Sequence, residues 1–415
     1  MVVSAPGARF SGDIKITDLL IRSAEEFKLS GKSKSAEEVI SRFKEIIPED
    51  NSLVASLSDE LQSRLAKTDA SNYVESLKAF GEYASGRVIA GILKGKGINA
   101  ECIDPMEFGP IILGNGHNAK PDPRCYKRMN KAFKSHKNIA IAVIPGFYGY
   151  DKSGMLVTLP RGGSDTSGAM VACAAGADTY ENWTDEDGLR RADPRIVANA
   201  ATIPEMTYDE ARELAYMGFK LQDACFEPIK GKGIVLAVKN TNNPAHPGTR
   251  IVDARESGPD ERIVGIACER NFVAIGMRKM YIDKEVGFGR KMLSVSEKMR
   301  LPYEHTLDGV DSVSLVLAKK YLKEKDALDT VIARLKKACR PEQTMTRDMA
   351  LVSVAGLGMK NHFDVHARTF AALAGQKIAV RMIDEGADDL SFFIGVDNER
   401  APDAVKAIYS EFFPG

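Results

Sequence analysis

The sequence predicts an α/β protein with a mostly parallel sheet sandwiched by helices, followed by two ferredoxin-like βαββαβ units. Two observations support this prediction. From residue 99 onward, short apolar runs alternate with helical segments, as in parallel strands joined by crossover helices. In the last third, the order strand, helix, strand, strand, helix occurs twice, over roughly seventy to eighty residues each, which indicates a duplicated unit.

Composition argues against several classes of protein. The chain has 415 residues, of which 44% are hydrophobic and 27% charged, enough to bury the cores of about two or three domains. Lys plus Arg and Asp plus Glu both number 57, so charge indicates neither nucleic acid nor a membrane as a partner. The six cysteines have no C-x-x-C spacing, and there is no signal-peptide pattern or apolar run of about eighteen residues. We therefore expect reduced thiols and a cytoplasmic protein.

The N-terminal part is predicted to be mainly helical. Met1-Val2-Val3 has the character of an apolar strand and precedes a polar loop. Glu82 follows Phe80 and Gly81 where one helix enters another, and two interpretations stay open. Its carboxylate either stabilises the dipole of a first helical turn, which is the commoner use, or binds a ligand. Helical spacing of apolar residues begins at Asp18 and covers residues 36–43, 53–65 and 73–93.

A glycine-rich turn between a strand and a helix is the most informative stretch. Arg161, Gly162 and Gly163 follow an apolar run, and Ser164 and Asp165 open a helix of small residues. Glycines let a ligand approach the backbone, the helix N-terminus attracts an anion, and a guanidinium matches a carboxylate or phosphate. An ordinary turn with a solvated arginine is the alternative. The apolar runs of this region are residues 100–103, 111–113, 139–144 and 155–158.

A second charged turn lies at residues 184–195, with four acidic residues and three arginines. It suits either a solvated loop or a nucleotide site in which an Asp binds the ribose and an Arg binds phosphate. Thr207 and Glu210 then have the spacing of a capping box and predict the start of a helix. Residues 235–238 predict a strand and residues 240–249 a turn, after which we expect a domain boundary.

The C-terminal third contains the two copies of the repeated unit. His362 and His366 lie four residues apart on a predicted helix, a spacing that suits zinc. No glutamate stands between them and no third ligand is nearby, so we expect no metal site. The first copy comprises residues 272–281, 289–299, 311–317 and 327–338, and the second comprises residues 350–354, 365–373, 390–396 and 401–412.

Six short motifs belong together: Val3-Ser4-Ala5, Phe80-Gly81-Glu82, Arg161-Gly162-Gly163-Ser164-Asp165, Thr184-Asp185-x-Asp187-Gly188, Asp193-Pro194-Arg195-Ile196-Val197, and Asn240-Thr241 ahead of Pro247-Gly248-Thr249. Their combination resembles the aspartate kinases of the amino-acid kinase superfamily over nearly the whole chain. Sister kinases that act on glutamate, acetylglutamate, carbamate or UMP share the core but not this pair of ACT domains. The resemblance implies a kinase domain at residues 1–255, a first ACT domain at 262–342 and a second at 343–415.

The resemblance also implies a reaction. ATP, with Mg²⁺ bound mainly through its phosphates, would phosphorylate the side-chain carboxylate of L-aspartate. In the family's pattern Arg161 binds the substrate's α-carboxylate, Glu82 binds its ammonium group, and Ser164 helps to seat it. The implied site residues are Arg161, Ser164, Asp165, Glu82 and Thr17 around the reacting groups, and Ser4, Thr184, Asp185, Arg195, Lys220 and Leu221 around the nucleotide.

The family's regulation is implied as well. We expect inhibition by lysine, threonine or both at an interface between ACT units, and a homo-oligomer formed through these units. Asp311 and Ser312 are expected to line the effector pocket, because an acidic residue offers a partner to the ammonium group of lysine. A different class of function stays open, namely a non-catalytic amino-acid sensor derived from such a kinase.

The sequence departs from the family's pattern in three places. Chains of the family usually open with a strand ending in K-F-G-G, whose lysine lies against the transferred phosphate, and that segment is not present ahead of Val2. We therefore expect the gene product to begin further upstream, and the chain without this lysine to be a poor catalyst. Arg190 stands where the family usually has a tyrosine, and residues 218–223 depart from its usual G-A-K-V-L-H.

Overall fold

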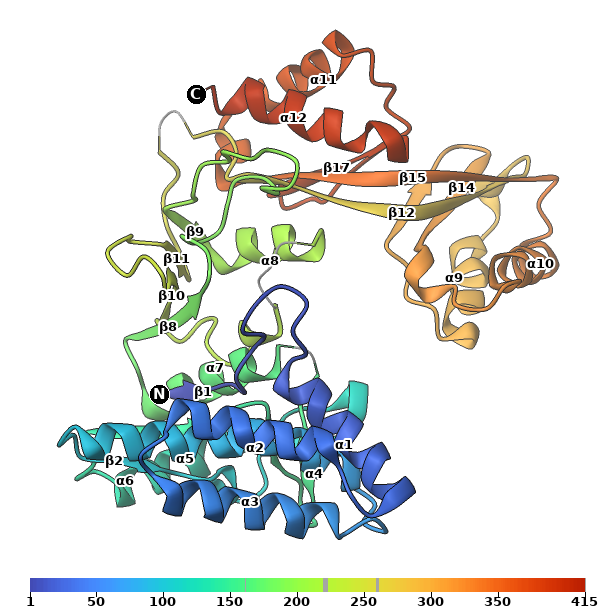
Figure 1. The fold of residues 1–415 in the computed structure, drawn as a ribbon. Helices are drawn as coiled ribbons and strands as arrows, with labels where there is room; N and C mark the ends of the chain where they lie inside the picture. The colour runs from blue at the N-terminus through green and yellow to red at the C-terminus, as the bar shows by residue number, and fades with distance from the viewer. Residues whose placement is uncertain (161, 219–222, 259–260, 415) are drawn as a thin grey trace. The chain divides into compact units, whose positions relative to one another are not determined.

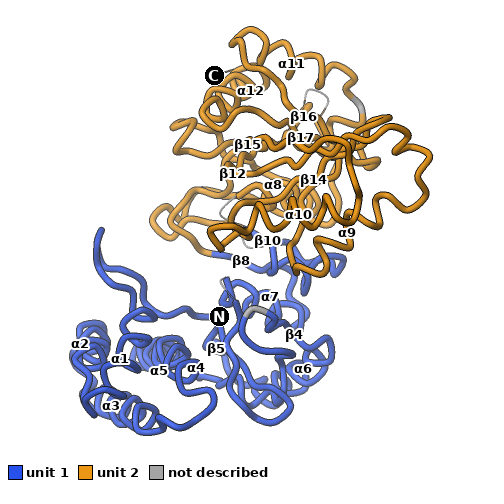
Figure 2. Tube along the Cα trace, turned by 90° about the vertical axis from the view of Figure 1, so that its right-hand side faces the viewer, with its two compact units in different colours: residues 1–182, 222–237 blue, residues 183–221, 238–415 orange. Residues whose placement is uncertain are grey.

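The computed structural model describes the chain apart from residues 161, 219–222, 259–260 and 415. The chain divides into two compact units, which Figure 2 shows in different colours. Unit 1 comprises residues 1–182 and 222–237, and unit 2 comprises residues 183–221 and 238–415. The kinase range expected from the sequence therefore contributes to both units.

A layer of helices opens unit 1 (Figure 1). Their apolar faces share one core around Leu19, Phe43 and Leu61, as the helical spacing predicted. Two of the helices have side-chain caps, because Ser33 and Asp50 accept hydrogen bonds from backbone N–H groups three residues later. The predicted helix 73–93 is two helices that meet at Ala79. The layer comprises α1 (Ile16–Ser30), α2 (Lys34–Ile46), α3 (Asn51–Leu65), α4 (Tyr73–Lys78) and α5 (Phe80–Gly95).

A parallel three-stranded sheet forms the centre of unit 1, in the order β1-β5-β2. The strands are β1 (Val2–Val3), β5 (Ile141–Pro145) and β2 (Ala100–Cys102). Helix α5 packs against β5 and β2, and α7 packs against β1, which confirms the predicted parallel sheet with covering helices. The remaining elements of this unit are β3 (Ile112–Leu113), β4 (Lys120–Pro121), α6 (Cys125–Ser135), β6 (Tyr148–Tyr150), β7 (Leu156–Thr158) and α7 (Gly163–Ala175).

A four-stranded sheet follows, in the order β8-β10-β11-β9. Strands β8 (Thr179–Thr184) and β10 (Val235–Asn240) continue from unit 1 into unit 2, and β9 (Glu205–Thr207) and β11 (Thr249–Val252) belong to unit 2. Helix α8 (Tyr208–Tyr216) begins at the predicted capping box. Thr207 and Glu210 exchange both of its hydrogen bonds, so that prediction is confirmed.

The C-terminal third forms one antiparallel sheet of six strands, in the order β13-β14-β12-β15-β17-β16. The predicted helices are present and pack in pairs, α9 with α10 and α11 with α12. The elements are β12 (Gly265–Arg278), α9 (Phe288–Met299), β13 (His305–Asp308), β14 (Ser312–Ala318), α10 (Ala327–Cys339), β15 (Gln343–Ala355), α11 (Val365–Gly375), β16 (Met382–Glu385), β17 (Ser391–Val396) and α12 (Ala401–Phe412).

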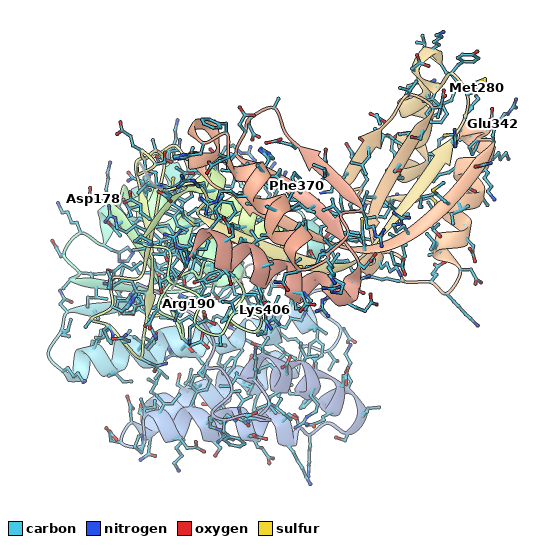
Figure 3. All side chains as sticks on the ribbon, turned by 90° about the horizontal axis from the view of Figure 1, so that it is seen from above. Asp178, Arg190, Met280, Glu342, Phe370 and Lys406 are labelled. Atoms are coloured by element: carbon cyan, nitrogen blue, oxygen red, sulfur yellow. The ribbon has the colours of Figure 1, made fainter. Side chains whose placement is uncertain are left out.

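Two long strands, β12 and β15, run through both repeats. Residues 272–278 of β12 pair with 343–349 of β15, and residues 265–269 pair with 351–355, on the two sides of an irregularity between Glu269 and Phe272. Figure 3 labels Met280 and Glu342 at one end of this ribbon, where the Met280 N–H donates to Glu342 Oε1 at 3.2 Å. The boundary expected at residue 342 therefore does not separate the strands: residues 343–349 pair with the first repeat, and residues 265–269 pair with the second. The residue ranges of the two ACT domains stay a prediction.

Among the described residues, no helix is both long and apolar enough to cross a membrane.

The close packing of α7 on β8 gives a first prediction. A Cβ at Gly168 would lie 2.3 Å from the hydroxyl oxygen of Tyr180, so Gly168→Ala forces one of them to move. We expect the free energy of unfolding to fall by about 1–3 kcal/mol. Gly91→Ala on α5 is the matched control, because its Cβ makes only an ordinary contact with Leu53; it should be neutral or stabilising by up to about 1 kcal/mol. Urea denaturation measures both, and equal losses would contradict the prediction.

Candidate functional site

The N-terminus of α7 packs closely against the loop that follows β5. Gly162 precedes it with a positive φ of 77°, a conformation that a side chain disfavours. A Cβ on Gly146 would lie 3.2 Å from the Cα of Ser164, so the loop after β5 lies directly against the first turn of the helix. The N–H of Phe147 donates to Ser167 Oγ at 3.0 Å and fixes this loop. Arg161, expected to bind the substrate's carboxylate, lies outside the described residues.

Two residues of strand β8 donate hydrogen bonds to Asp165. Its Oδ1 accepts a hydrogen bond from Asn182 Nδ2 at 3.1 Å, and its backbone carbonyl accepts one from the Tyr180 hydroxyl at 3.2 Å. Burial raises the pKa of Asp165 above its usual range, and the bond from Asn182 opposes that shift. Neither partner was identified from the sequence, because strand β8 shows no motif of its own.

Glu82 lies in the first turn of α5 and is only 5% exposed. Burial raises the pKa of its carboxyl to about 7, although the backbone N–H groups of Ala5 and of Glu82 itself oppose the shift. Its Oε2 atom is buried and has no hydrogen-bond partner among the described residues. A helix-dipole role requires no such burial, so this geometry favours the ligand interpretation over the dipole interpretation.

The other two N-terminal candidates lie on segments that meet Glu82. Ser4 directly follows β1 and precedes Ala5, and a Cβ on Gly81 would lie 2.7 Å from the Cβ of Ala5. Thr17 is the second residue of α1, whose first residue, Ile16, lies 3.3 Å from the same Cβ position. The end of β1 and the first turns of α1 and α5 therefore converge, and Ser4, Thr17 and Glu82 each lie next to a residue of this contact.

A pocket of about 530 Å³ lies in unit 2 and contains three of the expected nucleotide residues, Thr184, Asp185 and Arg195. The charged turn was predicted from the sequence, but the apolar walls were not, because they come from residues that belong to no motif. Lys220 and Leu221 lie outside the described residues. The rest of the lining is Glu186, Gly188, Leu189, Arg190, Ala192, Asp193, Pro194, Gly218 and Val238.

Hydrogen bonds to Asp187 hold the turn that borders this pocket. Its Oδ1 accepts from Asn240 Nδ2 at 2.8 Å and from Asn243 Nδ2 at 3.1 Å, and the bond from Asn240 lowers the pKa of Asp187 most. Gly188 has a φ of 100°, and a Cβ there would lie 2.6 Å from Thr249 Oγ1. These residues shape the backbone of the turn.

Arg195 is exposed, with 85% of its side chain accessible. Its guanidinium forms an ion pair with Asp193 at 2.7 Å, and both residues line the pocket. The pair leaves part of the guanidinium fork available for phosphate.

Within the described part of the chain, no group of three or more His, Cys, Asp or Glu side chains is placed to hold a metal ion. His366 instead contacts Glu385 at 3.1 Å, and its ring lies 4.5 Å from that of Phe392.

Comparison with known proteins assigns the family. Residues 1–240 match the amino acid kinase family, and residues 352–412 match an ACT domain. Aspartokinase 3 of Bacillus subtilis is 34% identical over 427 residues, an alignment that covers 100% of this chain and 92% of the relative. The chain belongs to the aspartate kinases. The resemblance found in the sequence motifs is therefore confirmed, and the protein is an enzyme of this family.

Solved structures of aspartate kinases have the same fold. The structure from Clostridium acetobutylicum is 36% identical, with a TM-score of 0.86 over 99% of this chain and 92% of that one. Aspartokinase III of E. coli, solved in complex with aspartate and ADP, shares the fold with a TM-score of 0.73 at 23% identity, over 99% of this chain and 92% of that one. The α/β kinase fold followed by ferredoxin-like ACT units is thus confirmed for this aspartate kinase.

The buried carboxyl of Glu82 predicts a pH dependence of stability. Below the unfolded-state pKa of 4.5 the group is protonated in both states. As pH rises from there through the folded-state value of about 7, the folded protein retains a proton that the unfolded chain has lost, so stability falls across this window. We expect the loss from this group to reach at most about 3 kcal/mol. Glu82→Gln should remove it.

Urea denaturation of both proteins at pH 5 and pH 8 measures the effect. The unfolding free energy of Glu82→Gln, relative to that of the unmodified protein, should be higher at pH 8 than at pH 5. An equal difference at both pH values would mean that Glu82 is ionised throughout.

Proposed function

We propose that this aspartate kinase transfers the γ-phosphoryl group of ATP to the side-chain carboxylate of L-aspartate. The product is 4-phospho-L-aspartate, which serves lysine, threonine and methionine synthesis. The names of the relatives that cover the whole chain support this reaction, and so does a site in unit 1 suited to an amino acid. The alternative of a non-catalytic sensor is not favoured, because these relatives are themselves kinases.

The single observation that carries the proposal is the buried carboxylate oxygen Oε2 of Glu82, which has no hydrogen-bond partner in the described part of the chain. A buried carboxylate without a partner is costly, and a cationic ligand removes that cost. The ammonium group of an amino acid supplies the cation. Its α-carboxylate would then lie with Ser164 at the N-terminus of α7, beside the guanidinium of Arg161.

The reaction requires positioning more than acid–base chemistry. The substrate's side-chain carboxyl has a reference pKa of about 3.9, so it is ionised at neutral pH and attacks without a general base. The bond from the γ-phosphorus to the leaving ADP oxygen breaks as the bond to the carboxylate oxygen forms. Orientation and neutralisation of charge on the phosphoryl oxygens supply most of the rate.

The pocket of unit 2 suits the nucleotide. Leu189, Ala192 and Val238 offer apolar walls to a purine ring, and Asp185 offers a carboxylate to the ribose hydroxyls. Arg195, with Lys220, would neutralise phosphates, and Thr184 would fix the turn against the nucleotide. Mg²⁺ would enter with ATP, bound mainly through the phosphate oxygens.

Regulation is part of the proposal. An amino-acid end product, lysine or threonine, would bind the ACT repeats near Asp311 and Ser312. The carboxylate Oδ1 of Asp311 already accepts the N–H of Tyr281 at 2.7 Å, which leaves its other oxygen for an ammonium group. We also propose that the repeats join copies of the chain into a homo-oligomer.

Trapping the product with hydroxylamine tests the reaction. With ATP and Mg²⁺, aspartate should give a hydroxamate and glutamate should give little, because glutamate carries one more methylene. Arg161→Lys should raise the KM for aspartate by about tenfold or more and spare that for ATP, because an ammonium cannot form the bidentate contact. Absence of aspartate-dependent ADP formation would reject the reaction, and equal effects on both substrates would reassign Arg161.

Proton release on aspartate binding tests the role of Glu82. At pH 6, below its pKa of about 7, most free protein holds a proton on this carboxyl. Pairing with the substrate's ammonium group requires the ionised form, so binding should release nearly one proton. Calorimetry in two buffers of different ionisation enthalpy counts that proton. Glu82→Gln should bind aspartate more weakly and release none, whereas an unchanged proton count in the variant would place the ammonium group elsewhere.

A further inference from the structure

One loop of unit 2 both lines the nucleotide pocket and packs into the C-terminal repeats. This pocket loop, residues 189–203, has two antiparallel arms. The N–H of Ile203 donates to the carbonyl of Leu189 at 2.8 Å, and the N–H of Arg191 donates to that of Ala201 at 2.9 Å. Figure 3 labels Arg190, whose neighbours on the first arm are Leu189 and Arg191. These two hydrogen bonds between the arms fix the ends of the turn that connects them.

The loop has two faces. Leu189 and residues 192–195 line the pocket, together with Arg190. Ala192 and Ala200 are buried in the hydrophobic core formed by the second repeat, in contact with the cluster that contains Ile266 and Phe392. A wall of the nucleotide pocket is therefore fixed to the core of the regulatory half of the chain.

Arg191 makes the polar contacts that attach the first arm, and it is not among the residues that line the pocket. Its Nη1 donates to the carbonyl of Val264 at 3.1 Å and weakly to that of Ile263 at 3.4 Å. Its guanidinium carbon lies 4.6 Å from the centre of the Phe413 ring, just beyond helix α12. The backbone carbonyl of Arg191 accepts the N–H of Ile266 at 2.7 Å. The side chain and the backbone carbonyl of Arg191 thus both contact the C-terminal repeats.

The second arm is held by the same helix end. The N–H of Ala201 donates to the hydroxyl oxygen of Tyr409 at 2.8 Å. The rings of Tyr409 and Phe413 lie 5.2 Å apart, and the Phe413 N–H donates to the carbonyl of Tyr409. One aromatic pair at the end of α12 therefore contacts both arms of the pocket loop.

We propose that Arg191 is a positioning residue for the nucleotide, and that Tyr409 and Phe413 at the end of α12 set its place. The inference rests on the proposed function, in which the pocket receives ATP. A guanidinium held over a ring and by two carbonyls has little freedom, so the turn that it anchors keeps its geometry. Displacement of that turn by a fraction of an ångström weakens contacts with the nucleotide and leaves the aspartate site in unit 1 unchanged.

Two aromatic truncations at the same helix end test the proposal. Phe413→Ala removes the ring from Arg191. Phe412→Ala is the matched control, because Phe412 lies 4.8 Å from the guanidinium of Arg368 on α11, which does not belong to the pocket loop. Both residues are partly buried against the same core, so their effects on the melting temperature should be similar. Phe413→Leu, which keeps apolar volume but lacks the ring's charge distribution, replaces Phe413→Ala if that variant does not fold.

The expected result is a difference between the two substrates. Phe413→Ala should raise the KM for ATP, and the Kd for ADP by calorimetry, about three- to tenfold, with the KM for aspartate and kcat within about twofold. Arg191→Met should do the same or more, and Arg191→Lys should recover part of the loss, since an ammonium also binds a ring face and a carbonyl. Phe412→Ala should leave the nucleotide constants unchanged.

The outcomes that overturn the proposal are distinct. The proposal fails if Phe413→Ala and Phe412→Ala change the nucleotide constants equally, or if the KM for aspartate rises as much as the KM for ATP. Either result would mean that these contacts contribute only to the stability of the fold. A protein that binds ADP in a manner dependent on Phe413 but never phosphorylates aspartate would refute the proposed function and retain this inference. A protein that phosphorylates aspartate, but whose nucleotide constants do not change on substitution of Phe413 or Arg191, would support the proposed function and refute this inference.

Discussion

A fully buried carboxylate, Glu210, joins three segments of unit 2 that are far apart in the sequence. One of its oxygens accepts from Arg255 at 2.6 Å and from the N–H of Leu357 at 2.9 Å, and the other closes the capping box of α8 with Thr207. Loss of one partner of such a buried pair costs about 3–5 kcal/mol, because the remaining charge is left unpaired. Helix α8, the segment around Arg255 and the second repeat are therefore constrained to one arrangement.

The C-terminal repeats and the pocket of unit 2 also share a hydrophobic core. Ala192 and Ala200 of the pocket loop are buried with residues of β12, β15 and α12, and Gly265 lets β12 approach, since a Cβ there would lie 3.2 Å from the carbonyl oxygen of Arg191. Close-packed cores transmit displacement because they contain little empty space. A change in the packing of the repeats therefore reaches a wall of the pocket through direct contacts.

Local chemistry made part of this structure predictable. The helices follow from apolar spacing, the start of α8 follows from Thr207 and Glu210, and the turn before α7 follows from its glycines. The exchange of strands between the repeats was missed, because the predicted strands covered only residues 272–281 and 350–354, and the pairing of β12 with β15 is set by contacts far apart in the sequence. The pocket walls at Leu189 and Val238 were missed for the same reason, since an apolar residue gives no sign of which surface it lines. The motifs supplied the charged residues of the candidate site, and only the fold supplied their surroundings.

The burial of Glu82 shows how such surroundings determine what a motif residue does. In water a glutamate near pH 7 is ionised and gains little from an ammonium ion, because both are well hydrated. At 5% exposure, with its pKa raised to about 7, the carboxyl is poised between its two states, and a bound cation shifts it fully to the ionised one. In the proposed complex, the ammonium group of an amino acid would offset the desolvation cost that the buried carboxyl of Glu82 imposes on the folded protein. A dicarboxylic acid without an amino group would offset none of this cost, so the proposed role of Glu82 implies selectivity for amino acids as well as affinity.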